Sequence, residues 1–129
     1  MYSQGEQTAA IEADIRVGDQ TFHILVTHLG NDGPIIQQEG VLRELEGEKN
    51  IIAMGDFNFR PDSEQYRLTL ETLADAWVLA GQDGGEEPVF NPAKRIDHIF
   101  VSPGTKVLRS WYDLSPESDH PALAADISW

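Results

Sequence analysis

The sequence predicts a single-domain α/β fold whose sheet is of mixed or antiparallel type. Segments near both ends of the chain alternate apolar and polar residues as half-buried strands do, and two segments between them repeat apolar residues at helical spacing. Clusters rich in Gly, Pro and Asp separate these segments and indicate turns. The expected order is β-β-α-β-α-β-β-β, and the length of 129 residues suits one domain rather than two.

The first two strands are expected to form a hairpin over residues 10–17 and 21–28, because Gly18 and Asp19 between them are a turn signal. A first helix is expected to begin at Pro34, which suits the first position of a helix, and to end near Gly47. The apolar side of this helix consists of Ile35, Val41, Leu42 and Leu45.

The second half of the chain continues the alternation. A short apolar run over residues 50–54 ends in Gly55 and Asp56 and is expected to be a buried strand. Asp62 followed by Gln65 resembles a capping box and predicts the start of a second helix. Residues 82–88 are a polar, Gly-rich loop, and the last strands are expected over residues 95–102, 106–114 and 121–129.

The charge balance argues against one class of function. The chain has 9 Lys and Arg against 22 Asp and Glu, a formal net charge of -13. Duplex-DNA binders draw most of their affinity from Lys and Arg that neutralise phosphates, so a simple binder of this kind is not expected. The surplus carboxylates indicate either a solvated surface or, for a few of them, a site for a hard cation such as Mg²⁺ or Ca²⁺.

Cysteine and apolar runs set further limits. The absence of cysteine excludes disulfides and thiolate metal sites. No apolar run approaches the ~20 residues that a membrane span needs, and no signal peptide is visible in residues 1–10. The cellular compartment therefore stays open.

Chemically capable side chains gather where the expected strands end. They are His28 after the second strand, Asp56 and Asn58 after the third, and Asp119 and His120 before the last. Asp97 differs, because it lies within an apolar strand, where a buried carboxylate needs a partner. A metal-assisted phosphoester site needs this combination: carboxylates for the cation, an imidazole for the proton, and donors for the phosphoryl oxygens.

Each of these residues also has a structural interpretation when it is taken alone. His28 by itself is most often a hydrogen-bonded residue at a strand end, and a Gly-Asp pair is usually a turn. Asp97 by itself is explained by a pair with Arg95 or with a backbone amide. His23 and His98 have no such context and are interpreted as structural or surface residues.

Four short motifs, taken in order, favour the functional interpretation. They are Thr27-His28-Leu29, Gly55-Asp56-Phe57-Asn58, Arg95-Ile96-Asp97-His98-Ile99-Phe100 and Ser118-Asp119-His120-Pro121. Together they resemble the endonuclease/exonuclease/phosphatase superfamily, which includes DNase I-like nucleases, apurinic endonucleases, sphingomyelinases and inositol-phosphate phosphatases. Residues 75–77 and 90–92 are also similar to bacterial members, and the resemblance runs from about Ala10 to Trp129.

The resemblance implies a reaction and a metal site. The reaction would be in-line attack of water on a phosphoester, without a covalent enzyme intermediate. Asp56 and Asp119 would be metal ligands, and Asp56 would also lie at the position of the attacking water. Asn58 would also belong to the metal site, and it would bind the phosphate or orient the nucleophile. The cation would be Mg²⁺, with Mn²⁺ or Ca²⁺ as alternatives.

The resemblance also implies a proton-transfer group. His120 would move the proton, and Asp97 would hold its tautomer, as in other His-carboxylate pairs. His28 would donate a hydrogen bond to a phosphoryl oxygen. We expect Asp97 to lie within about 3.2 Å of His120. We also expect the six candidate side chains to converge at one end of a single sheet.

By the same resemblance, residues 1–129 are one partial domain, the C-terminal half of a four-layer, DNase I-like α/β sandwich with its helices on one face of a mainly antiparallel sheet. The N-terminal half of the family fold supplies an Asn-bearing strand and a metal-ligating Glu, and Glu6, Glu12 and Glu39 lie in the wrong context to replace that Glu. The ligand set is therefore incomplete. We expect the isolated chain to bind Mg²⁺ weakly and to hydrolyse little.

Several interpretations of this half-domain stay open. It is a fragment or truncation of a larger phosphoesterase, a catalytically silent association module, or a non-enzymatic cation-binding domain. The expected substrate is a small phosphoester, a lipid head group or a nucleotide. A homodimer is expected if the inner face of the sheet is uncovered. Candidates for that face are Phe22, Ile24, Val26, Ile52, Ile99, Val101, Leu123 and Ile127.

Overall fold

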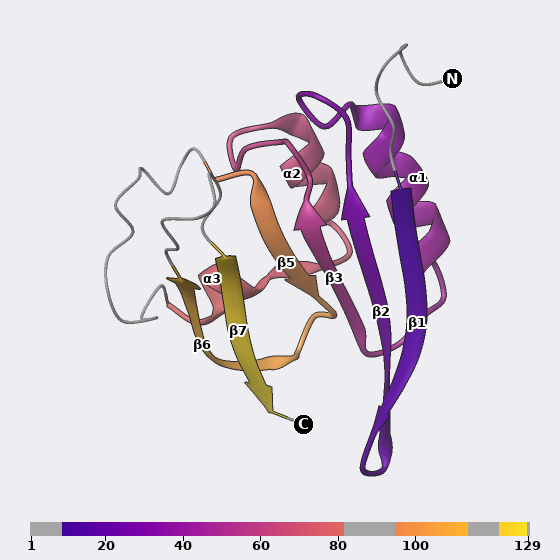
Figure 1. Cartoon of the computed structure of the whole chain (residues 1–129), viewed down its shortest axis with the longest axis vertical. Helices are drawn as coiled ribbons and strands as arrows, with labels where there is room; N and C mark the ends of the chain where they lie inside the picture. The colour runs from indigo at the N-terminus through magenta and orange to yellow at the C-terminus, as the bar shows by residue number, and fades with distance from the viewer. Residues whose placement is uncertain (1–8, 82–94, 114–121, 129) are drawn as a thin grey trace.

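The computed structural model describes residues 9–81, 95–113 and 122–128 (Figure 1). Within these ranges the chain forms strands and helices in the order expected from the sequence, with a short strand and a short helix added. The elements are β1 (Ala9–Val17), β2 (Gln20–His28), α1 (Ile35–Leu45), β3 (Ile51–Asp56), α2 (Glu64–Thr69), β4 (Ala74–Asp75), α3 (Ala76–Leu79), β5 (Asp97–Val101), β6 (Lys106–Asp113) and β7 (Ala122–Ser128).

Five of the strands form one mixed sheet in the order β1-β2-β3-β5-β4. β2 and β3 are parallel, and α1 connects them, as a parallel pair requires. The other neighbours in this sheet are antiparallel. β6 and β7 form a separate antiparallel ribbon. The α/β class and the mainly antiparallel sheet are confirmed.

A two-residue turn sets the register of the first hairpin. Gly18 has a φ of 61°, in the left-handed region that glycine adopts at little cost. Val17 therefore pairs with Gln20, and counting back along both strands pairs Asp14 with His23. This register brings acidic side chains of β1 next to the imidazole of His23.

Two helix starts differ from the expectation. α1 begins one residue after Pro34. The cap of α2 is Ser63 rather than Asp62, because Ser63 has extended backbone angles and its hydroxyl accepts from the Tyr66 amide at 3.1 Å. Asp62 is exposed. Ser63 at this position satisfies one of the amides that a helix start leaves without a partner.

The main core lies between one face of the sheet and the helices α1 and α2. Its members include Leu25, Leu29, Val41, Leu45, Phe57, Phe59, Tyr66 and Phe100. His98 lies among these rings, with 1% of its surface exposed, and its Nε2 donates to the Phe59 carbonyl at 2.8 Å. The interpretation of His98 as a structural residue agrees with this burial.

The opposite face of the sheet is covered over only part of its width. The β6–β7 ribbon packs there against β3 and β5 and forms a second cluster with Ile52, Ile99 and Val101. Over β1 and β2 the face stays open, because Ile11 is 70% exposed and Val26 is 43% exposed. No helix among residues 9–81, 95–113 and 122–128 is long and apolar enough to cross a membrane.

Candidate active site

Three of the predicted site residues form a row at one end of the five-stranded sheet. His28 of β2 is in register with Asp56 of β3, and Asp56 is in register with Asp97 of β5. The His28 Nε2 atom lies 3.5 Å from the Asp56 Oδ2 atom. The imidazole is 68% exposed and the carboxylate 19% exposed, so the row opens to solvent at His28.

Local backbone geometry places Asp56 in this row. Gly55 has a φ of 140°, and a Cβ there would lie 1.9 Å from the Thr27 carbonyl oxygen. Only glycine lets β3 approach β2 this closely while adopting such an angle. Packing therefore restricts position 55, directly before the candidate metal ligand Asp56, to glycine.

Asn58 is held next to Asp56 by two hydrogen bonds. Its backbone amide donates to the Asp56 Oδ1 atom at 3.0 Å, and its Nδ2 donates to the Leu29 carbonyl at 2.7 Å. Its φ is 58°, a left-handed conformation that Asn tolerates better than most residues. The turn after β3 thus brings the Asp56 carboxylate and the Asn58 amide to the same end of the sheet.

Arg95, two residues before Asp97, takes part in a buried network of polar side chains. Its Nη2 donates to the Asp75 Oδ2 atom, and both side chains are nearly inaccessible, at 6% and 1% exposed. The Tyr66 hydroxyl donates to the same carboxylate oxygen at 2.6 Å. Burial, together with the hydrogen bond to Asp75, raises the pKa of Tyr66 well above its usual range.

Asp119 and His120 lie outside the described residues. The contact between Asp97 and His120 therefore stays a prediction, as does the metal-ligand role of Asp119. What the structure brings together is His28, Asp56 and Asp97 in one row, with Asn58 beside them.

The oxygen donors at this end of the sheet fit a hard cation better than a soft one. Asp56 and the Asn58 side chain offer carboxylate and amide oxygens, the ligands that Mg²⁺ and Ca²⁺ prefer. The partly exposed Asp56 carboxylate leaves room for a cation that keeps several of its waters.

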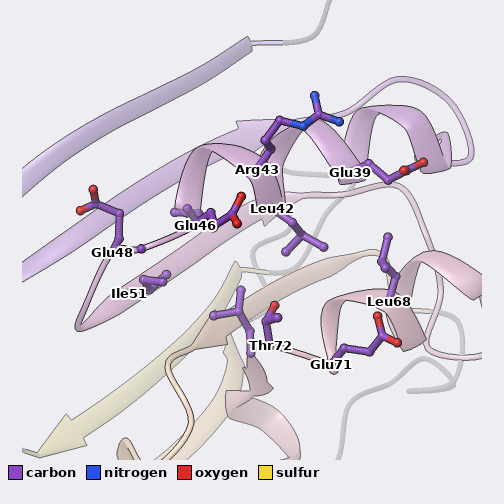
Figure 2. A pocket seen from close by; sticks show the side chains of 12 residues that line it. Glu39, Leu42, Arg43, Glu46, Glu48, Ile51, Leu68, Glu71 and Thr72 are labelled. Atoms are coloured by element: carbon purple, nitrogen blue, oxygen red, sulfur yellow. The ribbon is translucent and has the colours of Figure 1, made fainter.

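A cavity of about 500 Å³ lies between α1 and α2, away from this row (Figure 2). Leu42 and Ile51 line its apolar part, and Glu39 and Glu71 are among its acidic residues. Ile51 begins β3 and Asp56 ends it, five residues further along, which corresponds to about 17 Å of strand. The cavity and the candidate active site are therefore separate.

Comparison with known proteins decides the family. Residues 22–120 match the model of the Endonuclease/Exonuclease/phosphatase family. The chain belongs to this family. The match includes all six candidate site residues, from His28 to His120, although it does not assign their roles. No curated protein matches the chain significantly in sequence.

Solved structures of the endonuclease/exonuclease/phosphatase fold are similar to the chain. An endonuclease/exonuclease/phosphatase from Beutenbergia cavernae has a TM-score of 0.71 at 21% identity. The human Nocturnin catalytic domain, solved with a bound sulfate anion, has a TM-score of 0.71 at 26% identity. The TDP2 protein of D. rerio, complexed with a single-strand DNA product, has a TM-score of 0.73 at 15% identity. These likenesses confirm the DNase I-like fold.

The chain spans about half the length of these family structures. The alignments cover 94%, 94% and 95% of this chain but 39%, 52% and 62% of the three structures, in the order given above. The larger part of the B. cavernae protein, and about half of Nocturnin, thus has no counterpart in these 129 residues.

The structure contains two polar clusters whose members are not among the site residues predicted from the sequence. Asp75 and Arg95 both lie within motifs that the sequence singles out, but no spacing indicates that they pair. The second cluster surrounds His23 and contains Asp14 and Glu48. The sequence does indicate one pair of this cluster, because the turn at Gly18 fixes the register that sets Asp14 opposite His23.

Proposed function

We propose that the chain carries part of the active site of a divalent-metal-dependent phosphoester hydrolase. The observation that supports this most is the row of His28, Asp56 and Asp97 across three neighbouring strands of a family domain. An imidazole and two carboxylates at the solvent-facing end of a sheet combine a proton-carrying or donor group with oxygen ligands. The family is generally dependent on divalent metals.

The proposed roles follow from the position of each side chain. Asp56 and Asn58 would hold the cation together with Asp119. When bound, Mg²⁺, or Mn²⁺ or Ca²⁺ in its place, would polarise the phosphoryl oxygens. His28, which is exposed beside Asp56, would donate to one of these oxygens.

Asp97 and His120 are proposed to handle the proton. A carboxylate that accepts from one ring nitrogen of His120 favours the charged imidazole and fixes its tautomer, so the other nitrogen exchanges a proton with the attacking water. The half-buried position of Asp97 at the start of β5 suits such an orienting role.

We also propose that full activity needs a second half-domain. The family structures extend well beyond the region that aligns with this chain. The substrate is proposed to be a small phosphoester, a lipid head group or a nucleotide, and the net charge of -13 disfavours duplex DNA. The human Nocturnin catalytic domain was solved with a bound sulfate, a tetrahedral oxyanion like phosphate, which supports a phosphoester substrate for this chain.

Turnover of bis(p-nitrophenyl) phosphate tests this function. The 129-residue chain should show little hydrolysis, whereas a longer product in which the N-terminal half of a family domain precedes residue 1 should show EDTA-sensitive hydrolysis. Replacing Asp56 with Asn in the longer product should lower kcat by at least about 100-fold, as expected for losing a metal ligand or transition-state contact.

Asp62→Asn is the matched control for this experiment. It removes one exposed carboxylate of the same chemical type, six positions away from Asp56 and outside the row, and should leave turnover unchanged. Hydrolysis that survives both EDTA and Asp56→Asn would contradict the proposed function. Strong activity of the 129-residue chain alone would contradict the need for a second half.

A second candidate function is association with another copy of the chain. It rests on the face of the sheet opposite α1 and α2, which is open over β1 and β2. Ile11 and Val26 are register partners and are 70% and 43% exposed, and Ile15, further along β1 on the same face, is 47% exposed. Exposed apolar side chains that gather on one face mark an interaction surface. We propose that a second copy covers it across a two-fold axis, which is the commonest symmetry of soluble oligomers.

Sedimentation at micromolar concentration tests the dimer. The unmodified chain should sediment as a dimer, and Val26→Glu should shift it to a monomer because a charge would be buried at the interface. Leu70→Glu is the control, since Leu70 at the end of α2 is 42% exposed, almost the same as Val26. A monomer before any substitution, or equal effects of both variants, would contradict the dimer.

A further inference from the structure

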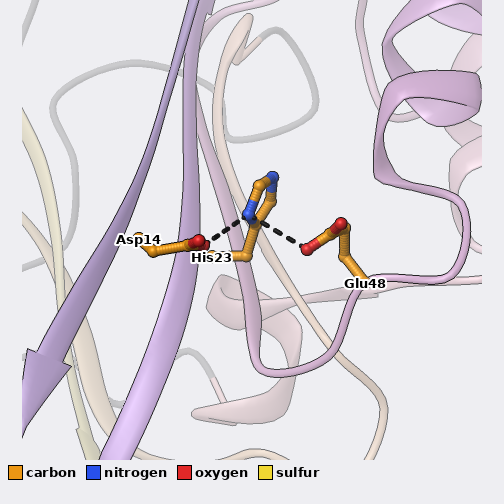
Figure 3. Close-up of side chains that lie close together, drawn as sticks. All are labelled: Asp14, His23 and Glu48. Carbon is orange, nitrogen blue, oxygen red and sulfur yellow. Dashed lines mark hydrogen bonds and ion pairs between the residues drawn. The ribbon is translucent and has the colours of Figure 1, made fainter.

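One histidine outside the candidate active site is surrounded by carboxylates (Figure 3). His23 of β2 faces Asp14 of β1, which is its register partner, and Glu48, which lies between α1 and β3. We propose that His23, Asp14 and Glu48 form a second metal site, which takes a first-row transition cation of the zinc type. The site would join the β1–β2 hairpin to the segment that follows α1.

The ligand atoms converge on one point. The His23 Nδ1 atom lies 2.8 Å from the Asp14 Oδ1 atom and 3.2 Å from the Glu48 Oε2 atom. All three atoms lie within 4.8 Å of one another. Nδ1 carries at most one proton, which points toward one acceptor at a time, whereas a cation in its place contacts both oxygens and the nitrogen.

The separations are close to those that a bound ion requires. Zinc bonds of about 2.0–2.1 Å at tetrahedral angles set neighbouring ligand atoms about 3.3 Å apart. The distance from the His23 Nδ1 atom to the Glu48 Oε2 atom already has nearly this value. The Asp14 Oδ1 atom would have to move away from Nδ1 by about 0.5 Å. The Asp14 and Glu48 side chains are 66% and 42% exposed, so both have room to adjust.

The other ring nitrogen has the carboxylate partner that a ligating histidine uses. The His23 Nε2 atom lies 2.8 Å from the Glu12 Oε1 atom. A neutral imidazole that donates from Nε2 to Glu12 presents a lone pair at Nδ1, aimed at two carboxylates that cannot donate to it. Histidines that ligate metals characteristically donate their second N–H to a carboxylate, which fixes the ring and strengthens the ligand.

A proton is the alternative occupant of this position. The hydrogen bonds to Glu12 and Asp14 raise the pKa of His23, so a protonated ring also satisfies these neighbours. Proton and cation would then compete for Nδ1, and cation binding should strengthen as the pH rises. The ligand chemistry favours zinc over Mg²⁺, because imidazole nitrogen suits zinc whereas Mg²⁺ prefers an all-oxygen set.

This site is distinct from the proposed phosphoesterase site. His23 and His28 are five residues apart on β2, about 17 Å along the strand, and alternation places them on opposite faces of the sheet. The role that fits the position is structural, because the ligands come from β1, from β2 and from the segment before β3. Failure of the zinc site would therefore not count against the phosphoesterase site, and the reverse also holds.

Calorimetric titration of the 129-residue chain with zinc chloride at pH 7.5 tests the proposal. The chain should bind one zinc ion with micromolar affinity, and Mg²⁺ at the same concentration should not compete. His23→Gln should weaken zinc binding at least 10-fold. Glu12→Gln should weaken it about 10-fold, as expected for a carboxylate that orients a ligating histidine.

Glu48→Gln and Glu44→Gln provide a matched pair of variants. Both remove one exposed carboxylate from the same part of the chain, but Glu44 lies on α1 outside the cluster. Only Glu48→Gln should weaken zinc binding, and this comparison decides the matter if His23→Gln does not fold. Asp56→Asn should retain the site.

A second readout does not depend on calorimetry. Saturating zinc should raise the thermal midpoint of the unmodified chain by several degrees and leave that of His23→Gln unchanged, because only the native state holds the ligands together. Equal zinc affinity in the unmodified chain, His23→Gln and Glu48→Gln would overturn the site. So would equal losses in Glu48→Gln and Glu44→Gln, which would indicate general attraction of cations to an acidic protein.

Discussion

Replacing Asp75 with Ala should destabilise the fold by about 3–5 kcal/mol, the usual cost of removing one partner of a buried ion pair. Asp75 and Arg95 are 1% and 6% exposed, so the guanidinium would keep its charge without the carboxylate that faces it. The same carboxylate accepts from the Tyr66 hydroxyl at 2.6 Å and from the Trp77 amide at 3.0 Å. The substitution therefore leaves several buried donors without this acceptor.

Urea unfolding followed by circular dichroism measures this effect, and the chain contains a natural control. Arg109 and Asp126 form an exposed pair at 3.9 Å, with both side chains more than half exposed. Asp126→Ala should cost less than about 1 kcal/mol, because exposed pairs contribute little. Equal effects of the two substitutions would show that the buried pair does not hold the fold together.

A double substitution separates charge from packing. Asp75→Ala combined with Arg95→Met removes both charges, and it should be less destabilising than Asp75→Ala alone because no unpaired charge stays buried. If the double variant is as unstable as the sum of the single ones, the cost comes from lost packing rather than from an isolated guanidinium.

Parts of the fold that depend on local signals were predictable from the sequence. The turn at Gly18 fixes the register of β1 and β2, and the alternation in both strands then assigns their faces. Gly55 followed by Asp56 marks the end of a buried strand, and the motifs around His28, Asp56 and Asp97 place these residues in strands that prove to be neighbours.

Other parts depend on contacts that no local pattern encodes. β4 spans two residues and α3 four, too short for either periodicity to be visible, and β4 is defined by its pairing with β5. The bond between Asp75 and Arg95 joins segments 20 positions apart. Ser63 rather than Asp62 caps α2 because of backbone angles that neither residue type specifies. These features arise from tertiary packing, which overrides weak local preferences.

The sheet face opposite α1 and α2 depends both on local sequence patterns and on tertiary contacts. Alternation assigns Phe22, Ile24 and Val26 to one face, but it does not reveal how much of that face the β6–β7 ribbon covers. In the structure Phe22 is 8% exposed and Val26 is 43% exposed. The exposed part of this face therefore lies over β1 and β2, and the same face carries the side chain of His28.

Acidification from pH 7 to pH 4 should remove about 3 kcal/mol of stability through His98 alone. Burial lowers the pKa of this imidazole from 6.5 to about 4. Between these two values the unfolded chain binds a proton that the folded chain does not, so stability rises with pH across this window and falls on acidification. A difference of about 2.5 pKa units corresponds to roughly 3 kcal/mol, because each unit corresponds to 1.36 kcal/mol.

His98→Phe isolates this contribution. Phenylalanine keeps an aromatic ring among Phe57, Phe59 and Phe100 but cannot be protonated. It also removes the donor to the Phe59 carbonyl, so the variant should be less stable at pH 7 by about 1–3 kcal/mol. The loss of stability between pH 7 and pH 4, measured by urea unfolding, should be smaller in the variant than in the unmodified chain by about 3 kcal/mol.

His23 provides a control of opposite sign. Its pKa is raised by the hydrogen bonds to Glu12 and Asp14, so its contribution is fully present below the ordinary value of 6.5 and is lost as the pH rises through the folded-state value. His23→Gln should therefore make the chain more sensitive to acid, while His98→Phe makes it less sensitive. If His98→Phe leaves the pH dependence unchanged, or makes the chain more sensitive to acid as His23→Gln does, the folded state does not keep His98 neutral by burying it.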